Sequence, residues 1–436
     1  MIETFQNIFK IPELKKRVIF TLLMLGVYRI GSHIPVPGID SQALAEFFTR
    51  ASGTILGFFD MFSGGALKRL TIFALGIMPY ISASIILQLL TVVIPALERL
   101  SKEGEAGRKK ITQYTRYGTV ILSIIQGLGI SYGLEHMKSP TGAPVVPDGG
   151  WSFRLLGMIT LTAGTAFIMW LGEQITEKGI GNGISLIIFA GIVASMPDAI
   201  AQTIQSVKSG DLNLIFVVFL VLIMVGIVGI IIYVERGQRK IPVQYAKRII
   251  GRKVYGGQNT HIPLKINTAG VIPVIFASSI IMFPATIASF YNNRITQAIA
   301  SGLAPGSILY EMLYIIFIVF FCYFYTAIIF NPLDLAENMK KYGGFIPGIR
   351  PGKRTSEYID RVLTRITLVG AIYLSAVSVL PDFLIRYANV PFYFGGTALL
   401  IVVGVAMDTA SQIESHLLTR HYEGFLKKGR MHGRRG

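Results

Sequence analysis

The chain has 436 residues, of which 52% are hydrophobic and only 15% are charged, and its formal net charge is +17. Soluble domains average about 25% charged residues, so this composition excludes a chain of two or three soluble domains. The charges are absent from long apolar runs, and crossing the hydrocarbon core of a membrane takes about 20 such residues per helix. The sequence therefore predicts an all-α, polytopic membrane protein.

Ten apolar runs follow one another along the chain, and each is typical of a membrane-spanning helix. The predicted spans are residues 18–34, 71–93, 114–134, 153–172, 182–196, 214–234, 269–290, 309–330, 366–382 and 392–409. The fifth and ninth are short, which indicates a thin stretch of membrane or helices that continue into flanking Gly and Pro residues. Ten spans permit two inverted halves of five helices, although we detect no sequence identity between the halves.

Residues 54–70, TILGFFDMFSGGALKRL, lie between the first and second spans and are apolar, but too short and interrupted to cross. Gly64 and Gly65 are expected to end a helix there. Two placements remain open. The segment is either a re-entrant half-helix, surrounded by protein or water because lipid cannot satisfy its free backbone groups, or an amphipathic helix on the outer surface.

The distribution of Lys and Arg predicts the topology, because short loops rich in these residues stay in the cytosol. With the N-terminus inside, the alternating loops place the whole excess of +17 on the cytosolic face, and both termini lie there. Two readings of this basic face remain open. It attracts anionic lipid headgroups, or it also binds an anionic partner such as ribosomal RNA, which suits loop 235–266, where Glu235 is the only acidic residue.

The longest polar stretches are two loops predicted in the cytosol, at about 235–266 and 331–365. Both contain Gly, Pro and clustered basic residues, as in GGFIPGIRPGKR, a composition typical of ordered, protruding loops with turns. These loops are the expected docking surface.

The motifs of catalysis are missing from the sequence. HExxH, GxSxG and GxxxxGK[ST] do not occur, and the six histidines lie at span ends, in loops or in the tail. The single cysteine, Cys322, lies inside the eighth span and predicts a packed small side chain. The sequence therefore argues against an enzyme and predicts no cofactor and no metal site.

An ion-coupled secondary transporter of small solutes is the competing class, but it needs ionisable side chains in mid-membrane. Only Arg29 lies well inside a span, near its outer end, where the side chain can reach the interface. A pore without charges is closed instead by apolar side chains. The residues alone do not identify them, because pairs such as Ile77/Ile81 and Ile184/Ile188 also face lipid in many helices.

Six long strings resemble the SecY family, the channel subunits of the bacterial Sec translocase. They are MFSGGALKRLTIFALGIMPYISASIILQLL (61–90), EGEAGRKKITQYTRYGT (103–119), MWLGEQITEKGIGNGIS (169–185), THIPLKINTAGVIPVIFASSI (260–280), FNPLDLAENMKKYGGFIPGIRPG (330–352) and VPFYFGGTALLIVV (390–403). They occur in the family's order across nearly the whole chain. GIMPYISAS and PFYFGGT favour the bacterial branch.

The resemblance implies an hourglass of two halves, residues 1–200 and 201–436, with the pore between them. The ring that closes the pore would be Ile77, Ile81, Ile184, Ile188, Ile275 and Ile401. Residues 54–70 would hold the plug that seals the outer funnel, namely Phe58, Phe59, Asp60, Met61, Phe62, Ser63, Gly64 and Gly65. Ser82, Gln126 and Asn267 resemble the polar cluster of a lateral gate that releases transmembrane segments into lipid.

The resemblance also implies location and partners. Unfolded preproteins with signal sequences would cross the bacterial cytoplasmic (inner) membrane through a channel surrounded by membrane lipids. A helix of SecE would clamp the channel, with SecG as an accessory subunit. Energy would come from the SecA motor ATPase or the ribosome, which dock on the cytosolic loops through Arg350 first, then Arg252 and Lys253. Lys68 and Arg69 make the plug's end basic, and their effect on plug release is left open.

Overall fold

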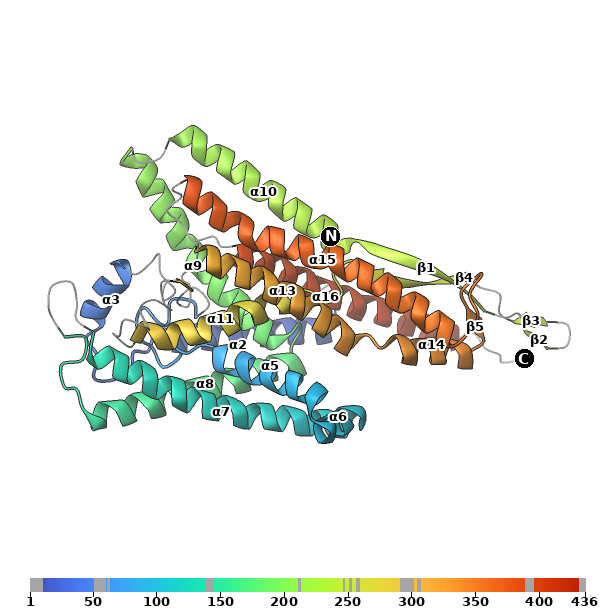
Figure 1. Ribbon diagram of the computed structural model, residues 1–436, viewed down its shortest axis with the longest axis horizontal. Helices are drawn as coiled ribbons and strands as arrows, with labels where there is room; N and C mark the ends of the chain where they lie inside the picture. Colours follow the sequence, from blue (N-terminus) through green and yellow to red (C-terminus); the bar gives the residue numbers. More distant parts are fainter. Residues whose placement is uncertain are drawn as a thin grey trace.

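The structure is a computed structural model that describes residues 11–50, 60, 63–137, 144–210, 213–245, 248–250, 253–255, 259–290, 302–303, 307–388 and 396–430. Long helices dominate it and run along a common direction (Figure 1). They are α2 (Pro12–Gly31), α5 (Met78–Val93), α7 (Glu105–Glu135), α8 (Trp151–Lys178), α9 (Gly183–Lys208), α10 (Leu214–Arg236), α11 (Ile272–Phe290), α13 (Ile308–Ile329), α15 (Lys353–Ala388) and α16 (Gly396–Arg430). A helix therefore lies at each of the ten predicted positions.

Seven of the described helices are long and apolar enough to cross a membrane by themselves: α7, α8, α9, α10, α13, α15 and α16. Helix α5 and the short α6 (Pro95–Lys102) form a further apolar pair, bent by 100°. The mostly helical membrane fold is confirmed, and the count of ten spans stays a prediction.

The two short predicted spans are parts of longer helices, which is one of the two readings that the sequence left open. The spans predicted to be short belong to helices of 26 and 36 residues, α9 and α15, because these helices continue through polar sequence beyond the apolar run. The predicted division at residue 200 therefore falls inside α9.

The second span begins later than predicted. Residues 71–77 form turns, and the helix starts only at Met78, with Pro79 in its first turn. The preceding backbone takes positive φ at Leu70 (38°) and at Gly76 (56°), which no α-helix tolerates. These turns are buried in the bundle, so their apolar composition reads like a span although their conformation is not helical.

A small sheet extends from one end of the bundle, which we call the sheet end. Strand β1 (Gln238–Tyr245) pairs antiparallel with β4 (Asn259–Lys265) and with β5 (Gly344–Phe345). A distal hairpin, β2 (Arg248–Ile250) and β3 (Lys253–Tyr255), lies farthest from the helices (Figure 1). Side chains from the sheet, from α14 (Pro332–Lys341) and from the start of α15 form a separate apolar cluster. The described parts of both loops are thus ordered, as predicted.

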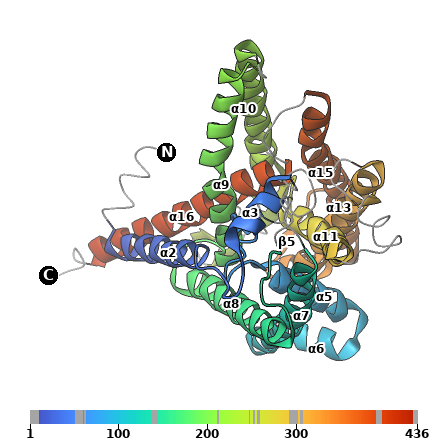
Figure 2. The ribbon, with the colours of Figure 1, turned by 90° about the vertical axis from the view of Figure 1, so that its left-hand side faces the viewer.

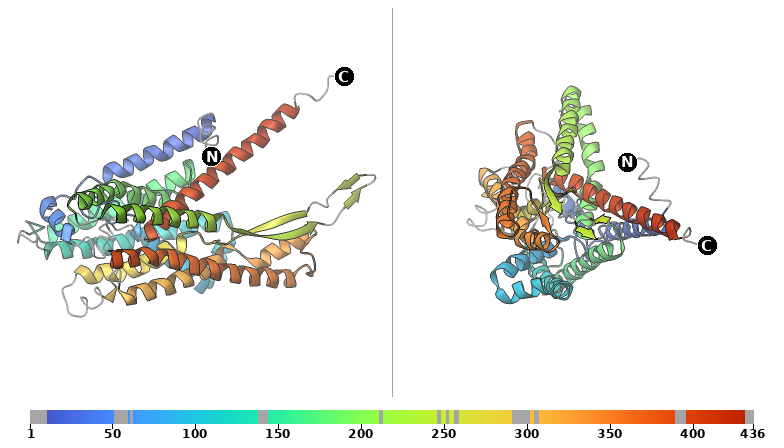
Figure 3. Two further views of the ribbon diagram at one scale, coloured as in Figure 1. Left: turned by 90° about the horizontal axis from the view of Figure 1, so that it is seen from above. Right: turned by 90° about the vertical axis from the view of Figure 1, so that its right-hand side faces the viewer.

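One large apolar cluster fills the bundle and includes side chains from α2–α9 and from α10–α16. Helix α3 (Ser41–Arg50) lies at the end opposite the sheet (Figures 1 and 2). Helix α16 runs well past the bundle towards the C-terminus (Figure 3). Its outer part packs near the start of α2 through a third cluster that contains Leu14, Ile180, Ile413 and Leu417.

Candidate functional site

The six isoleucines predicted for the ring come from four helices and lie in or against one apolar cluster. Ile77 caps α5 and Ile81 follows in its first turns, while the others lie in α9, α11 and α16. Five of them are buried, with exposed fractions from 0% for Ile401 to 5% for Ile275. Ile184 is half-buried against the same cluster. Branched alkyl groups from both halves of the chain thus belong to the same apolar cluster.

The end of the predicted plug is tied to α2. The Tyr28 hydroxyl donates a hydrogen bond to the Ser63 carbonyl oxygen at 3.1 Å, and Arg29 Nη1 donates to the Gly64 carbonyl oxygen at 2.8 Å. Gly64 has φ of +68°, and a Cβ there would lie 2.9 Å from Gly191 Cα in α9. Only glycine fits this approach.

The rest of the described plug region is compact and buried. The Asp60 carboxylate accepts a hydrogen bond from the Lys68 backbone N–H at 2.7 Å, and burial raises the pKa of this carboxyl above its ordinary value. Residues 63–70 form turns with Lys68 and Arg69 exposed, so this part is not an amphipathic surface helix. Phe58, Phe59, Met61 and Phe62 lie outside the described residues.

Helix α11 packs against α5 and α7, and we call this contact the α11 seam. Ser279 Oγ in α11 lies 3.9 Å from Met78 Sδ at the start of α5, a distance at the limit of an O–H···S contact. The Ser278 and Ser279 hydroxyls otherwise donate to the Ile275 carbonyl oxygen of their own helix, at 2.9 and 2.7 Å. Sequence reasoning missed these serines, whose signal was two adjacent hydroxyls within an apolar run.

The residues predicted for the lateral gate have different surroundings. Ser82 in α5 and Gln126 in α7 are half-buried, and both helices contact α11. The Gln126 amide oxygen is buried and has no hydrogen-bond partner among the described residues. Asn267 precedes α11, and its amide donates to Glu235 Oε1 at 2.6 Å and to the Gly270 carbonyl oxygen at 3.0 Å. Neither bond reaches Ser82 or Gln126.

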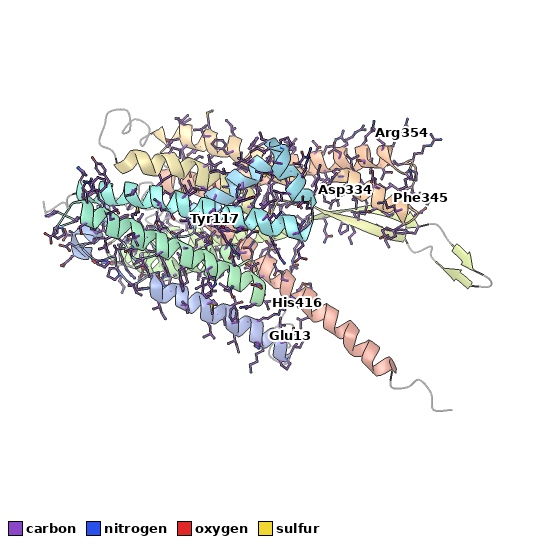
Figure 4. All side chains as sticks on the ribbon, turned by 90° about the horizontal axis from the view of Figure 1, so that it is seen from below. Glu13, Tyr117, Asp334, Phe345, Arg354 and His416 are labelled. Carbon is purple, nitrogen blue, oxygen red and sulfur yellow. The ribbon has the colours of Figure 1, made fainter. Side chains whose placement is uncertain are left out.

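Helix α16 contacts α9, and together with the turn 179–182 between α8 and α9 it forms what we call the α16 seam. Gln412 Oε1 in α16 accepts a hydrogen bond from the Gly181 N–H at 3.1 Å. The Ile180 N–H donates to Thr21 Oγ1 of α2 at 3.1 Å. Figure 4 shows Glu13 of α2 and His416 of α16 near one another beside this contact.

Two of the three predicted docking residues, Arg350 and Lys253, belong to the sheet end. Arg350 is exposed, and its carbonyl oxygen accepts a hydrogen bond from Thr355 Oγ1 at 2.9 Å, which fixes the loop before α15. Figure 4 shows Arg354, Phe345 and Asp334 at this same end. Lys253 lies in β3, and Arg252 lies outside the described residues.

Comparison with known proteins identifies close relatives along nearly the whole chain. The family model described as SecY matches residues 71–410. The protein translocase subunit SecY of Escherichia coli (strain K12) is 54% identical over 426 residues, which cover 97% of this chain and 96% of that protein. The protein of the same name from Aquifex aeolicus is 50% identical over 429 residues, covering 98% of this chain and 100% of that protein.

Solved structures share the fold at low sequence identity. One described as a protein-conducting channel has a TM-score of 0.63 and 18% identity, with 92% of each chain covered. The Sec61 chain of a canine ribosome–channel complex from the endoplasmic reticulum has a TM-score of 0.60 and 17% identity, again with 92% of each chain covered.

Proposed function

The chain belongs to the SecY family, and on this premise we propose how its parts conduct an unfolded polypeptide. It is a multi-pass membrane protein and the channel subunit of a protein translocase, a family that is not an enzyme. The alternative of an ion-coupled transporter is not supported, because the relatives matched over nearly the whole chain are translocase subunits.

The observation that carries the proposal is that Ile81, Ile188, Ile275 and Ile401, from four helices, are buried in one apolar cluster. Branched alkyl groups that close a narrow passage keep it dry, and a dry constriction excludes ions. The same side chains offer no hydrogen bonds to a passing polypeptide. Ile77 and Ile184 would complete this ring, which lets a chain slide through while it blocks solutes.

The plug and the gate act on either side of this ring. Residues 58–65 would seal the outer funnel at rest, and the ties of Ser63 and Gly64 to α2 support a fixed base for the plug. Ser82 and Gln126 would line the lateral gate at the α11 seam. A signal helix that enters lipid there gains roughly 0.8 kcal/mol per buried methylene, which stabilises the open gate.

Energy must be supplied from outside, because no nucleotide-binding motif occurs in the sequence. The exposed Arg350 and the neighbouring basic residues support docking of the SecA motor or the ribosome at the sheet end, which we place in the cytosol with both termini. SecE and SecG would hold two halves, near residues 1–200 and 201–436, in the bacterial inner membrane.

The test replaces two ring residues from different helices, Ile188 and Ile275, by Ser. Hydroxyls wet the constriction, so the idle channel in a planar bilayer is expected to conduct ions. The matched control replaces Ile168 and Ile175 of α8, which are equally buried but lie outside the ring. Each large-to-small change costs about 2–5 kcal/mol, so both variants lose stability. The proposed ring is contradicted if the ring variant does not conduct ions, or if the control variant conducts them equally well.

A further inference from the structure

The hairpin formed by β1 and β4 follows α10 almost directly, and residues 266–271 join it to α11. It leaves the bundle after α10 and returns to it just before α11, the helix of the α11 seam (Figure 1). Gln238 pairs with Lys265, and one rung further in the Ile266 N–H donates to the Gly237 carbonyl oxygen at 2.9 Å. The ladder therefore closes at the membrane bundle, beside the end of α10.

Asn267 occupies this junction. Its side chain is 4% exposed, and the two N–H groups of its amide reach opposite sides. One donates to Glu235 Oε1 in the last turn of α10 at 2.6 Å, and the other to the Gly270 carbonyl oxygen just before α11 at 3.0 Å. A short hydrogen bond to a carboxylate is about twice as strong as a neutral one. A single side chain thus fastens the end of α10 to the turn that precedes α11.

The neighbouring helices leave the junction little freedom. A Cβ at Gly370 of α15 would lie 2.8 Å from the Ile266 carbonyl oxygen, and one at Gly404 of α16 would lie 2.5 Å from Val271 Cγ1. Close backbone packing of this kind transmits displacement instead of absorbing it. The segment of residues 266–271 therefore packs closely against α15 at Ile266 and against α16 at Val271.

We propose that Asn267 and Glu235 are positioning residues that couple the hairpin to α11, so that a partner docked at the sheet end moves the helix of the α11 seam. The inference rests on the proposed docking function. Asn267 then has a role at the base of the hairpin, where its amide forms both hydrogen bonds, in addition to the gate role that the sequence suggested.

The test exchanges donor and acceptor. Asn267→Asp sets two carboxylates against each other, and the double variant Asn267→Asp with Glu235→Gln restores a hydrogen bond with its direction reversed. Both variants lose the bond to the Gly270 carbonyl oxygen, so the difference between them isolates the link to Glu235. Glu235→Gln alone keeps an acceptor for Asn267 and is the conservative control.

The readout is the oxidation of cysteines placed at Met78 and Ser279, with Cys322 replaced by Ala, in channels reconstituted with SecE and SecG. In the parent channel, SecA and ATP are expected to slow the rate of cross-linking across the α11 seam roughly tenfold. This factor corresponds to the free energy of about one charge-assisted hydrogen bond. Asn267→Asp should bind SecA normally and lose this slowing, and the double variant should regain it. The proposed coupling is overturned if SecA still slows cross-linking in Asn267→Asp. It is also overturned if SecA does not slow cross-linking in the double variant.

Two further measurements separate this proposal from the docking on which it rests. Arg350→Glu is expected to abolish SecA binding itself. If slower cross-linking is lost because SecA no longer binds, the result bears on the docking proposal and not on the coupling. Hydrogen exchange needs no partner: Asn267→Asp should speed exchange in β4 and at the start of α11 together, and the double variant should reverse both. Exchange that is unchanged in both elements would overturn the coupling whatever SecA does.

Discussion

The α11 seam and the α16 seam both join helices α2–α9 to helices α10–α16, yet their chemistry differs. In the α11 seam, apolar side chains meet, and Ser279 and Met78 approach only to 3.9 Å. In the α16 seam, the Gly181 N–H bonds to Gln412, and Ile180 packs in a cluster with Ile413. The α11 seam is apolar and weakly bonded, whereas the α16 seam combines a hydrogen bond with close packing.

This difference indicates how the bundle can open at one seam while the other seam holds its two parts together. Apolar faces that separate into lipid exchange one set of apolar contacts for another, because lipid tails are as apolar as the side chains they replace. Separating the α16 seam would strip a backbone N–H of its partner, which costs about 1–3 kcal/mol when the group is buried. We infer that the α11 seam opens and that the α16 seam stays closed as the pivot.

The largest expected effect comes from forcing the α16 seam apart. Gly181 has φ of +88°, and a Cβ there would lie 2.8 Å from Leu186 Cδ1 and 3.2 Å from Thr409 Oγ1. Gly181→Val is therefore expected to lower the free energy of unfolding in detergent by roughly 2–5 kcal/mol.

Gly210 supplies the matched control, because its φ is +83° and nothing lies within 4 Å of its Cβ position. Gly210→Val should cost only the backbone strain, roughly 1–3 kcal/mol. Equal losses at the two glycines would mean that the α16 seam is not tightly packed.

A middle effect is expected from the hydrogen bond of the α16 seam. Gln412→Ala leaves the Gly181 N–H without its side-chain acceptor and should cost about 1 kcal/mol. Gln412→Glu keeps the acceptor and should cost less. Chemical denaturation of both variants in micelles measures the difference, and a Glu variant as unstable as the Ala variant would argue against this bond.

The smallest effect is expected in the α11 seam. Ser279→Ala removes a hydroxyl that already bonds to the Ile275 carbonyl oxygen of its own helix, so the cross-seam contact contributes little. The free energy of unfolding should change by no more than about 0.5 kcal/mol. A loss above 1 kcal/mol, roughly the net value of a typical hydrogen bond, would show that a polar contact contributes to the stability of this seam.

The sequence predicted the helices well and their ends less well, for a physical reason. Apolar runs mark the hydrocarbon core, so a helix lies at every predicted position, but α15 starts at Lys353 in polar sequence that no hydropathy pattern assigns. Residues 71–77 mislead in the opposite way, since burial inside the bundle requires apolar side chains whether or not the backbone is helical.

The site was harder to predict than the helices. The isoleucines share a cluster because four distant segments meet, and only the family resemblance singled them out from other apolar residues. The bond from Asn267 to Glu235 joins residues on either side of a hairpin, and no spacing in the sequence reports it. Ser279 was missed because a hydroxyl in a membrane helix is most often satisfied by its own backbone.

The most direct test of the account locks each seam in turn and measures transport. Cysteines at Met78 and Ser279 lock the α11 seam, and cysteines at Ile180 and Ile413 lock the α16 seam, with Cys322 replaced by Ala in both. We predict that oxidation of the first pair stops SecA-driven preprotein transport into vesicles and that reduction restores it, whereas oxidation of the second pair leaves transport intact. Transport that continues with the α11 seam locked, or that stops with only the α16 seam locked, would contradict the account.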